Sequence, residues 1–294
     1  AGQQARERKM PENPVHHCTK LNDGSDYTDW SYVYFGSYPQ TEVTGEELTD
    51  EIIGADYDGN GDAMVEGVKY RRIKKSDANF SSDKDGYYSW AGEDDYHYFK
   101  WERIKWRVLQ KNNDTLFVMA DQALDCKCYN DEYLASMTWE NCTLRNWLNS
   151  SFYNMAFSAA EQEAVVVQNV VNEDNPYGAD GGNNTTDKVY LLSIGETTNP
   201  SYGFCETGTT YSMSRRLKPS NYAYARGAYT ASSDNCNWWL RAPGGHTYYA
   251  ACVATHGYVA SYGIYVHDNR GTVVPALHIN LSSNLWTTEE DDTG

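Results

Sequence analysis

The spacing of hydrophobic and polar positions predicts several strands. Residues 96–120 give the clearest case, because Ile104, Trp106 and Val108 alternate with charged neighbours before a polar turn and an apolar return. Successive side chains of a strand point to opposite faces, so this pattern indicates a pair of half-buried strands. Further segments rich in β-type residues predict a strand at 32–43, a strand pair at 54–73 and a strand at 188–194.

Helices are predicted in two regions. Residues 138–170 carry apolar side chains at three- and four-residue steps, and Ser158 and Glu161 have the spacing of a capping box. Residues 212–229 predict a helix with a proline step, and the polar stretch 172–187 predicts a loop. Because strands and helices are segregated along the chain rather than alternated, we expect an α+β fold with mixed short strands.

From Trp238 onward the pattern predicts short strands joined by glycine turns. Valine returns at Val253, Val259 and Val266, and the residues between these positions are mixed. When short strands follow one another and the chain reverses at each turn, each strand can point one valine toward the core. The three valines are therefore expected to point inward, while the residues between them face water or a partner.

The chain is predicted to hold one domain with a polar segment on each side. Residues 1–30 are rich in charge and predict a flexible lead or stalk, 31–286 the domain, and 287–294 an acidic tail. The net charge of −17 opposes phosphate backbones, which excludes nucleic acid as the main partner. The sequence has no apolar run of about 18 residues, so we expect no membrane insertion.

Metal and catalytic motifs are weak, and we predict no cofactor and no metal. Cys126 and Cys128 form C-x-C rather than a zinc or redox motif, and most of the seven cysteines are expected to be buried thiols. His246, His256 and His267 are predicted to be surface histidines of a binding region, with convergence on a metal as the alternative. The stretch "DYDGNGD" (56–62) resembles the start of a calcium loop but lacks its closing acid, so we interpret it as a turn.

The composition of the C-terminal region is unusual. Between Leu240 and Leu285 there is no Lys, Glu, Gln, Met or Trp, although solvated surfaces normally carry Lys and Glu. These five types are the ones that a codon ending in a pyrimidine cannot encode. With "WWLRAPG" (238–244) before the valines and "VVPALHINL" (273–281) after them, the region resembles the variable proteins of diversity-generating retroelements. It is most similar to an uncharacterised domain family common in gut-associated bacteria.

The resemblance runs from about residue 32 to 282 and also rests on "YVYFGSYPQTEV", "FKWERIKWRVL" and "TWENCTLRNWLNSSFYNMAFSAAEQ". It implies a C-type lectin fold related to formylglycine-generating enzymes, with its terminal strands meeting. In such systems adenine-directed copying errors replace residues of a variable region, here about 240–280, on a fixed scaffold. The implied ligand-binding, variable positions are His246, Tyr248, Tyr249, Cys252, Ala254, Thr255, His256, Tyr258, Ala260, Ser261, Tyr262, Ile264, Tyr265, His267 and Asp268. The implied scaffold positions are Trp238, Trp239, Arg241, Val253, Val259 and Val266.

The sequence departs from that family at Val274, where an Arg is usual before Pro-Ala-Leu, so a bracing arginine would have to be Arg241 or Arg270. The expected function is non-enzymatic display of a surface that binds a protein or glycan ligand, outside the cell, on a bacterial surface or on a phage virion. One alternative is an oxidase of the formylglycine-generating type, with Cys236 and Cys252 holding copper. The other is a calcium-dependent lectin or adhesin using Asp268 and Asn269.

Overall fold

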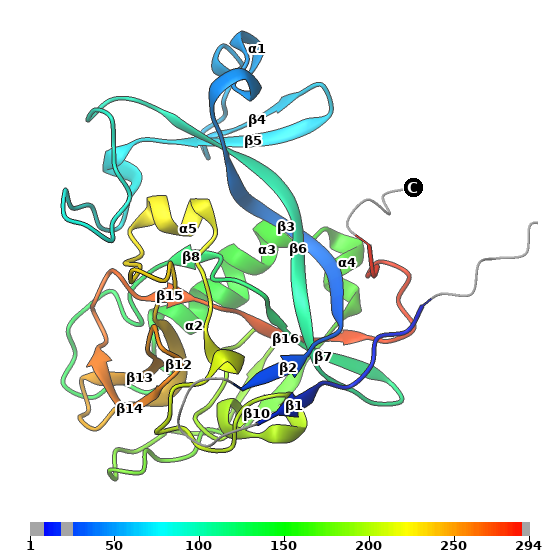
Figure 1. Cartoon of the computed structure of the whole chain (residues 1–294), viewed down its shortest axis with the longest axis vertical. Coiled ribbons are helices and arrows are strands. Elements are labelled where there is room, and N and C mark those ends of the chain that lie inside the picture. The colour runs from blue at the N-terminus through cyan, green and yellow to red at the C-terminus, as the bar shows by residue number, and fades with distance from the viewer. Residues whose placement is uncertain (1–8, 19–25, 290–294) are drawn as a thin grey trace, which may run out of the picture.

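The computed structural model describes residues 9–18 and 26–289 of the chain. Residues 1–8 and 19–25 of the predicted lead, and 290–294 of the predicted acidic tail, lie outside the described residues. Within the described part, two sheets and a group of short helices form the body, and α1, β4 and β5 project from it at the top of Figure 1. The mixed α+β class is confirmed.

The larger sheet has the order β4-β5-β6-β7-β16-β9, and β3 pairs with β6 on its other side. All of its pairings are antiparallel. The predicted strand pair at 96–120 becomes β6 and β7, and β3 coincides with the predicted strand at 32–43. The strands are β3 (Tyr32–Val43), β4 (Asp62–Val65), β5 (Val68–Ile73), β6 (His97–Lys111), β7 (Thr115–Ala120), β9 (Val165–Val166) and β16 (Ala276–Asn280).

The smaller sheet has the order β14-β13-β12-β15-β8 and contains most of the C-terminal region. β12 and β15 are parallel, and the other neighbours are antiparallel. This arrangement confirms the prediction of short strands from Trp238 onward and leaves β14 at an edge of the sheet (Figure 1). The strands are β8 (Asp125–Cys126), β12 (Trp238–Pro243), β13 (Tyr249–Val253), β14 (Val259–Tyr265) and β15 (Thr272–Val273).

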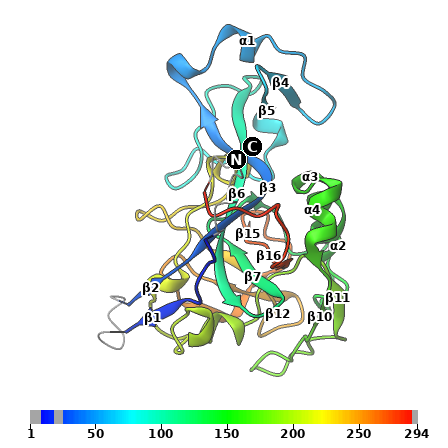
Figure 2. The ribbon, with the colours of Figure 1, turned by 90° about the vertical axis from the view of Figure 1, so that its right-hand side faces the viewer.

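Short helices line one side of the strands of the larger sheet (Figure 2). Ser158 and Glu161 form the predicted capping box at the start of α4, and the Glu161 carboxylate also accepts a hydrogen bond from Gly36 N. The helices of this group are α2 (Thr143–Trp147), the π-helical turn η3 (Leu148–Phe152), α3 (Tyr153–Ala156) and α4 (Ala159–Ala164). In the projection, 3-10 turns η1 (Gly45–Glu47) and η2 (Lys75–Asp77) accompany α1 (Asp50–Ile53).

Three predicted elements differ from the structure. The predicted helix at 138–170 ends at Ala164, because the valine-rich residues that follow form β9 and β10 (Gln168–Val170), and β10 pairs with β11 (Thr185–Asp187). The predicted helix at 212–229 is only α5 (Asn221–Arg226), because Pro219 keeps the preceding chain extended and Ser220 caps the first turn. The predicted strand at 188–194 makes a single bridge, from Tyr190 to Ala276.

The N-terminal residues are more ordered than the polar composition predicts. Within residues 1–30, β1 (Val15–His17) and β2 (Tyr27–Asp29) form an antiparallel pair that contacts the 3-10 turns η5 (Pro200–Tyr202) and η6 (Met213–Arg215). These described residues of the predicted lead therefore form strands that contact the body of the domain. A further 3-10 turn, η4 (Glu196–Thr198), precedes η5.

The start of β3 lies beside the chain near Thr287, through an isolated bridge outside the named strands. Tyr34 of β3 and Thr287 exchange two backbone hydrogen bonds of 2.7 and 3.0 Å. One large hydrophobic core joins the two sheets and the helices, and a small separate cluster holds the projection. The largest fully buried side chains of the large core are Trp106, Trp139, Trp238, Trp239 and Trp286.

Candidate ligand-binding face

The β13–β14 hairpin holds its valines inward. Val253 and Val259 lie opposite each other next to the turn, and both are buried. Val266, directly after β14, is also buried. The prediction that these three side chains anchor the region to the core is confirmed.

Glycine is required at fixed points of this hairpin. Gly263 has a φ of +80°, and a Cβ there would lie 2.1 Å from the carbonyl oxygen of Ala250 on β13. Gly257, in the turn, also has a φ of +80°, and its Cβ would lie 2.0 Å from the carbonyl oxygen of Ser212. Any other residue would be strained in conformation and would clash with neighbouring backbone. Packing thus explains the regular glycines and valines of the C-terminal sequence.

A continuous network of rings covers the outer side of the hairpin, on the end away from the turn. Tyr248 and Tyr265 stack with their centroids 5.8 Å apart, and Tyr249 meets Tyr265 edge-on at 4.8 Å. Tyr262 contacts Tyr249 at 5.6 Å and hydrogen-bonds to His246. We call this network the aromatic face, and its eight members are Tyr133, Tyr177, His246, Tyr248, Tyr249, Tyr262, Tyr265 and His267.

Two of these rings come from loops outside the C-terminal region. Tyr133 contacts Tyr248 and His267, with centroid distances of 5.9 and 5.3 Å. Its loop is held against the hairpin by backbone hydrogen bonds from Asn130 N to Val266 O and from Met137 N to Thr247 O, each 2.9 Å long. The sequence offered no signal for Tyr133, because its loop has neither periodicity nor an unusual composition.

Tyr177 is placed by a buried asparagine. The side-chain amide of Asn175 donates hydrogen bonds to Pro243 O, at 2.6 Å, and to Ser261 O, at 2.7 Å. This fastens the polar loop to β12 and β14 and brings Tyr177 edge-on to Tyr262 at 5.4 Å. The loop prediction for 172–187 is correct except for Thr185–Asp187, which form β11, and it gave no reason to place Tyr177 in the site.

The fifteen implied variable positions differ in exposure. Tyr262 and Tyr265 are 44% and 48% exposed, and Tyr258 is 37% exposed. The exposed members are His246, His256, Tyr258, Tyr262, Tyr265 and His267. The half-buried members are Tyr248, Tyr249, Ala254, Thr255, Ala260, Ser261, Ile264 and Asp268.

Cys252 is the member that the structure contradicts. It lies on β13, in the interior of the sheet between Trp239 and Ala260, and is buried. Its side chain cannot reach a ligand without unfolding the hairpin. Ala260 and Ile264 are half-buried and pack against the core, so packing constrains both positions.

The exposed positions also fall into two groups. Tyr258 and His256 belong to the β13–β14 turn, at the opposite end of the hairpin from Tyr249 and Tyr265. With Tyr211, whose ring lies 4.9 Å from that of His256, they line a shallow pocket. From the sequence we expect several of Tyr248, Tyr258, Tyr262 and Tyr265 to lie exposed on one face. Tyr262 and Tyr265 are exposed together on the aromatic face, whereas Tyr258 is exposed at the turn.

The implied scaffold residues at the start of β12 are buried and hydrogen-bonded. Trp238 Nε1 donates to Arg215 O at 3.1 Å, and Trp239 Nε1 donates to Lys127 O at 2.9 Å. The buried Arg241 guanidinium donates to Leu191 O and Val171 O, at 2.9 and 3.0 Å, and pairs with Glu196.

Arg270 makes a different set of contacts. It is exposed and pairs with its near neighbour Asp268, at 2.6 Å. Burial opposes ionisation of Asp268, but hydrogen bonds from Arg270 outweigh it and lower the pKa of the carboxyl. Of the two arginines that the sequence left open, Arg241 therefore braces the scaffold.

Asp268 and Asn269, the pair considered for a lectin-type calcium site, both make contacts within the chain. Asp268 pairs with Arg270, and the Asn269 side chain donates to Asn79 O.

Hydrogen bonding within the aromatic face stabilises the neutral form of one phenol. A side-chain hydrogen bond with Tyr265 raises the pKa of Tyr249 to about 12. At physiological pH the ring of Tyr249 therefore offers an apolar body and a neutral hydroxyl. Such groups suit contacts with the mixed polar and apolar surfaces of proteins or glycans.

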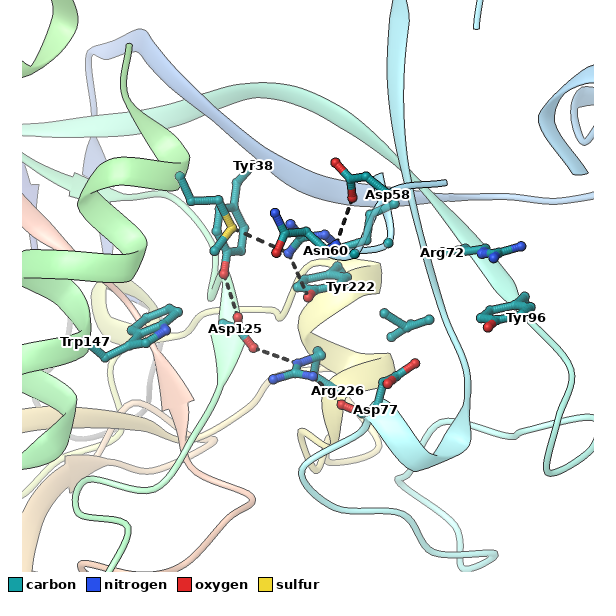
Figure 3. A pocket seen from close by; sticks show the side chains of 15 residues that line it. Tyr38, Asp58, Asn60, Arg72, Asp77, Tyr96, Asp125, Trp147, Tyr222 and Arg226 are labelled. Atoms are coloured by element: carbon teal, nitrogen blue, oxygen red, sulfur yellow. Dashed lines mark hydrogen bonds and ion pairs between the residues drawn. The ribbon is translucent and has the colours of Figure 1, made fainter. Parts of the chain in front are cut away.

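A polar pocket of about 350 Å³ lies elsewhere, between the projection and α5 (Figure 3). Tyr38 Oη donates to buried Asp125 at 2.6 Å, and Arg226 pairs with the same carboxylate at 3.3 Å. Arg71, also lining the pocket, forms a two-point pair with buried Asp62. The "DYDGNGD" segment borders the pocket as the predicted turn, with Asp58 Oδ1 accepting from Asn60 N and Asp62 N. Each of the two buried carboxylates, Asp125 and Asp62, is therefore paired with an arginine that lines the pocket.

The cysteines of the oxidase alternative are ordinary buried thiols. Burial raises the pKa of Cys236 and of Cys252 to about 12 in each case. The Cys236 Sγ lies 3.5 Å from Leu217 O and 3.7 Å from Thr272 Oγ1. Copper binding and nucleophilic attack both require the thiolate, which these surroundings disfavour.

The chain belongs to a family defined by a domain of unknown function (DUF6273), whose model matches residues 113–281, more than half of the chain. The match includes every residue of the aromatic face. No curated protein and no solved structure matches the chain. Among the described residues, none of the helices has the length and apolar character needed to cross a lipid bilayer.

Proposed function

We propose that the protein binds a macromolecular ligand, a protein or a glycan, through the aromatic face and performs no chemistry on it. The observation that carries this proposal is the eight-ring network, in which exposed Tyr262 and Tyr265 join rings from two separate loops. Exposed aromatic clusters of this kind are uncommon on surfaces without a partner.

Physical chemistry favours tyrosine for this role. A tyrosine ring supplies a large contact area and one hydroxyl while losing few rotatable bonds on binding. Rings that already contact one another are partly fixed before binding, which reduces the entropy cost of association. Val253, Val259 and Val266 are buried in the core and none of them belongs to the aromatic face, so substitution of its exposed rings leaves these anchors in place.

In its finer form the proposal assigns the protein to the variable proteins of diversity-generating retroelements, on a C-type lectin fold. Two observations support this assignment. The residue types between Leu240 and Leu285 are compatible with substitution at codons ending in a pyrimidine. Fourteen of the fifteen implied variable positions, all except Cys252, are exposed or half-buried, whereas the valines between them are buried. A display role would place the protein on a bacterial surface, on a virion or outside the cell.

The binding proposal is tested on protein and glycan arrays with the full chain and a Tyr248→Ala/Tyr262→Ala/Tyr265→Ala variant. We expect the array signals of the parent to fall at least tenfold in this variant, because hot-spot tyrosines each contribute roughly 2 kcal/mol or more. A matched control replaces Tyr96 and Tyr229, two exposed tyrosines outside the aromatic face, and should leave the signals unchanged.

Equal losses in the variant and the control would show that exposed tyrosines act nonspecifically. Retention of every signal in the triple variant would place the binding surface elsewhere. The oxidase alternative predicts tight stoichiometric copper binding by Cys236 and Cys252, and the lectin alternative predicts glycan signals that a calcium chelator abolishes.

A further inference from the structure

A cluster of three metal-ligating side chains lies away from the aromatic face, where the β1–β2 pair contacts the loop that leads into η6. The residues are His16 on β1, Asp26 just before β2, and Cys205. One ligating atom from each lies within 4.8 Å of the other two. The side chains of His16 and Asp26 are only 8% and 5% exposed, and Cys205 is also buried.

Hydrogen bonding fixes the tautomer of His16. Thr28 Oγ1 donates its hydrogen to Gly203 O at 2.6 Å, so it has no hydrogen left for the imidazole. The 3.0 Å contact between His16 Nδ1 and Thr28 Oγ1 must therefore run from Nδ1–H to the hydroxyl oxygen. In the neutral ring with its hydrogen on Nδ1, the Nε2 atom carries a lone pair.

This lone pair points at other electron-rich atoms. His16 Nε2 lies 3.6 Å from Asp26 Oδ2, too far for a hydrogen bond, and has no hydrogen-bond partner although it is buried. Leaving a buried polar atom unsatisfied is costly, and placing a lone pair beside a carboxylate adds repulsion. A cation between these atoms would remove both costs.

Hydrogen bonds from neighbouring groups also orient the proposed ligand atoms, as in metal sites. Asp26 Oδ2 accepts from Ser212 Oγ at 2.5 Å, and Asp26 Oδ1 accepts from Met213 N at 2.7 Å. Thr28 Oγ1 accepts the hydrogen bond that orients the imidazole of His16. The nearby Arg215 guanidinium donates to backbone carbonyls, among them Gly257 O and Cys205 O, and leaves the carboxylate to face His16. Outer hydrogen bonds that fix the ligand atoms are typical of metal centres.

We propose that His16, Asp26 and Cys205 bind a divalent transition-metal ion, with zinc(II) as the ion that suits this donor set. One nitrogen, one oxygen and one sulfur ligand are common for zinc and unsuited to magnesium or calcium. Two ligand atoms at the usual zinc distances lie roughly 3.4 Å apart in a tetrahedron, close to the 3.6 Å between Nε2 and Oδ2. Water or another donor completes the fourth position.

The ion would join two parts of the chain that are distant in sequence. It ties the β1–β2 pair to the segment that contains Ser212, whose backbone N donates to His256 O in the β13–β14 turn. Zinc binding should therefore raise the melting temperature, because the ion binds the folded chain better than the unfolded one. This site goes beyond the ligand-binding role and does not depend on it.

The test uses the tag-free full chain, stripped with a chelator and titrated with Co²⁺ and then Zn²⁺. We expect one ion per chain, a thiolate-to-cobalt charge-transfer band, and loss of that band when Zn²⁺ displaces Co²⁺. His16→Gln and Cys205→Ser should each weaken zinc binding at least about 100-fold. The matched controls His17→Gln and Cys236→Ser should bind as the parent does, since these side chains lie outside the cluster.

Thr28→Val keeps the side-chain shape but removes the oxygen that fixes the tautomer, and should weaken binding about 10- to 100-fold. Absence of the thiolate band in the parent chain would overturn the proposal without reference to any variant. Zinc binding that persists unchanged in both His16→Gln and Cys205→Ser would overturn it as well, because the ion would then sit elsewhere.

Discussion

The rings of Tyr248 and Tyr265 stack across the outer side of the β13–β14 hairpin, with 15° between their planes and 5.8 Å between their centroids. Val253 and Val259, next to the turn of the same hairpin, and Val266, directly after β14, are buried in the core. The buried side chains of this hairpin therefore contribute packing, and its exposed rings present groups that a ligand can contact. Substitutions of the two groups should differ in their effect on stability.

Removing rings from the outer side should cost little stability. We expect Tyr262→Ala and Tyr265→Ala each to lower the free energy of unfolding by about 1 kcal/mol or less, because both side chains are nearly half exposed. Val259→Ala, on the inner side, should cost roughly 2 kcal/mol or more, because it leaves a cavity. Urea unfolding measures all three, and equal costs on both sides would contradict the division.

Gly263 should not tolerate a side chain. Gly263→Ala places a Cβ 2.1 Å from Ala250 O at a φ of +80°, so it combines a strained conformation with a clash. Gly67→Ala is a matched control, because Gly67 has a φ of +82° and open space around its Cβ position. The control should cost about 1–2 kcal/mol, the usual price of a left-handed conformation, and Gly263→Ala clearly more. Thermal denaturation compares them, and equal shifts in melting temperature would show that the close approach to Ala250 is unimportant.

Arg241 should matter for stability and Arg270 should not. Arg241→Met leaves Glu196 and the carbonyls of Leu191 and Val171 without their buried partner, and we expect a loss of about 3 kcal/mol or more. Arg270→Met breaks an exposed ion pair with Asp268 and should cost about 1 kcal/mol or less. Chemical denaturation distinguishes the two variants, and the reverse order would make Arg270 the bracing residue.

His278 should make the fold sensitive to acid. Burial lowers its pKa from 6.5 to about 4, and Glu196 offsets this only in part. Between these values the unfolded chain binds the proton more readily than the folded chain, so the free energy of unfolding falls as the pH drops through this window. The contribution is up to roughly 3 kcal/mol.

His278→Gln retains a partner for Tyr190 Oη, which lies 2.9 Å from the imidazole, but does not titrate. Urea unfolding at several pH values should show a weaker pH dependence for this variant than for the parent. His246→Gln, at an exposed position of the aromatic face, is the control and should follow the parent. An unchanged slope in His278→Gln would show that other groups dominate acid sensitivity.

Periodicity and composition predicted much of the frame of this fold. Alternation located β3, β6 and β7, and the recurrence of Val253 and Val259 located the inward side of the hairpin. These signals are local in sequence, because one face of a strand is buried along its whole length. The ends of the helices were less predictable, since Pro219 and the valines after Ala164 override a helical pattern.

The sequence did not predict every residue that belongs to the candidate site. Tyr133 and Tyr177 join the aromatic face through hydrogen bonds of Asn130 and Asn175, which are tertiary contacts without a sequence signature. The prediction for Cys252 is wrong in the opposite direction, because the family resemblance implied a variable position while its place inside the sheet buries it. Exposure of an individual position on a central strand depends on what covers the sheet, and one sequence does not contain that information.

The account is tested most directly by sequencing this gene and its flanking DNA in independent isolates. If the outward-facing residues are replaceable, amino-acid differences between isolates should concentrate at exposed positions such as Tyr262, Tyr265 and His267. Val253 and Gly263 should be unchanged. It also predicts a near-copy of the codons for residues 240–280 beside a reverse transcriptase, with adenines at the substituted sites. Identical residues across the aromatic face in every isolate, with differences scattered over the rest of the chain, would contradict the account.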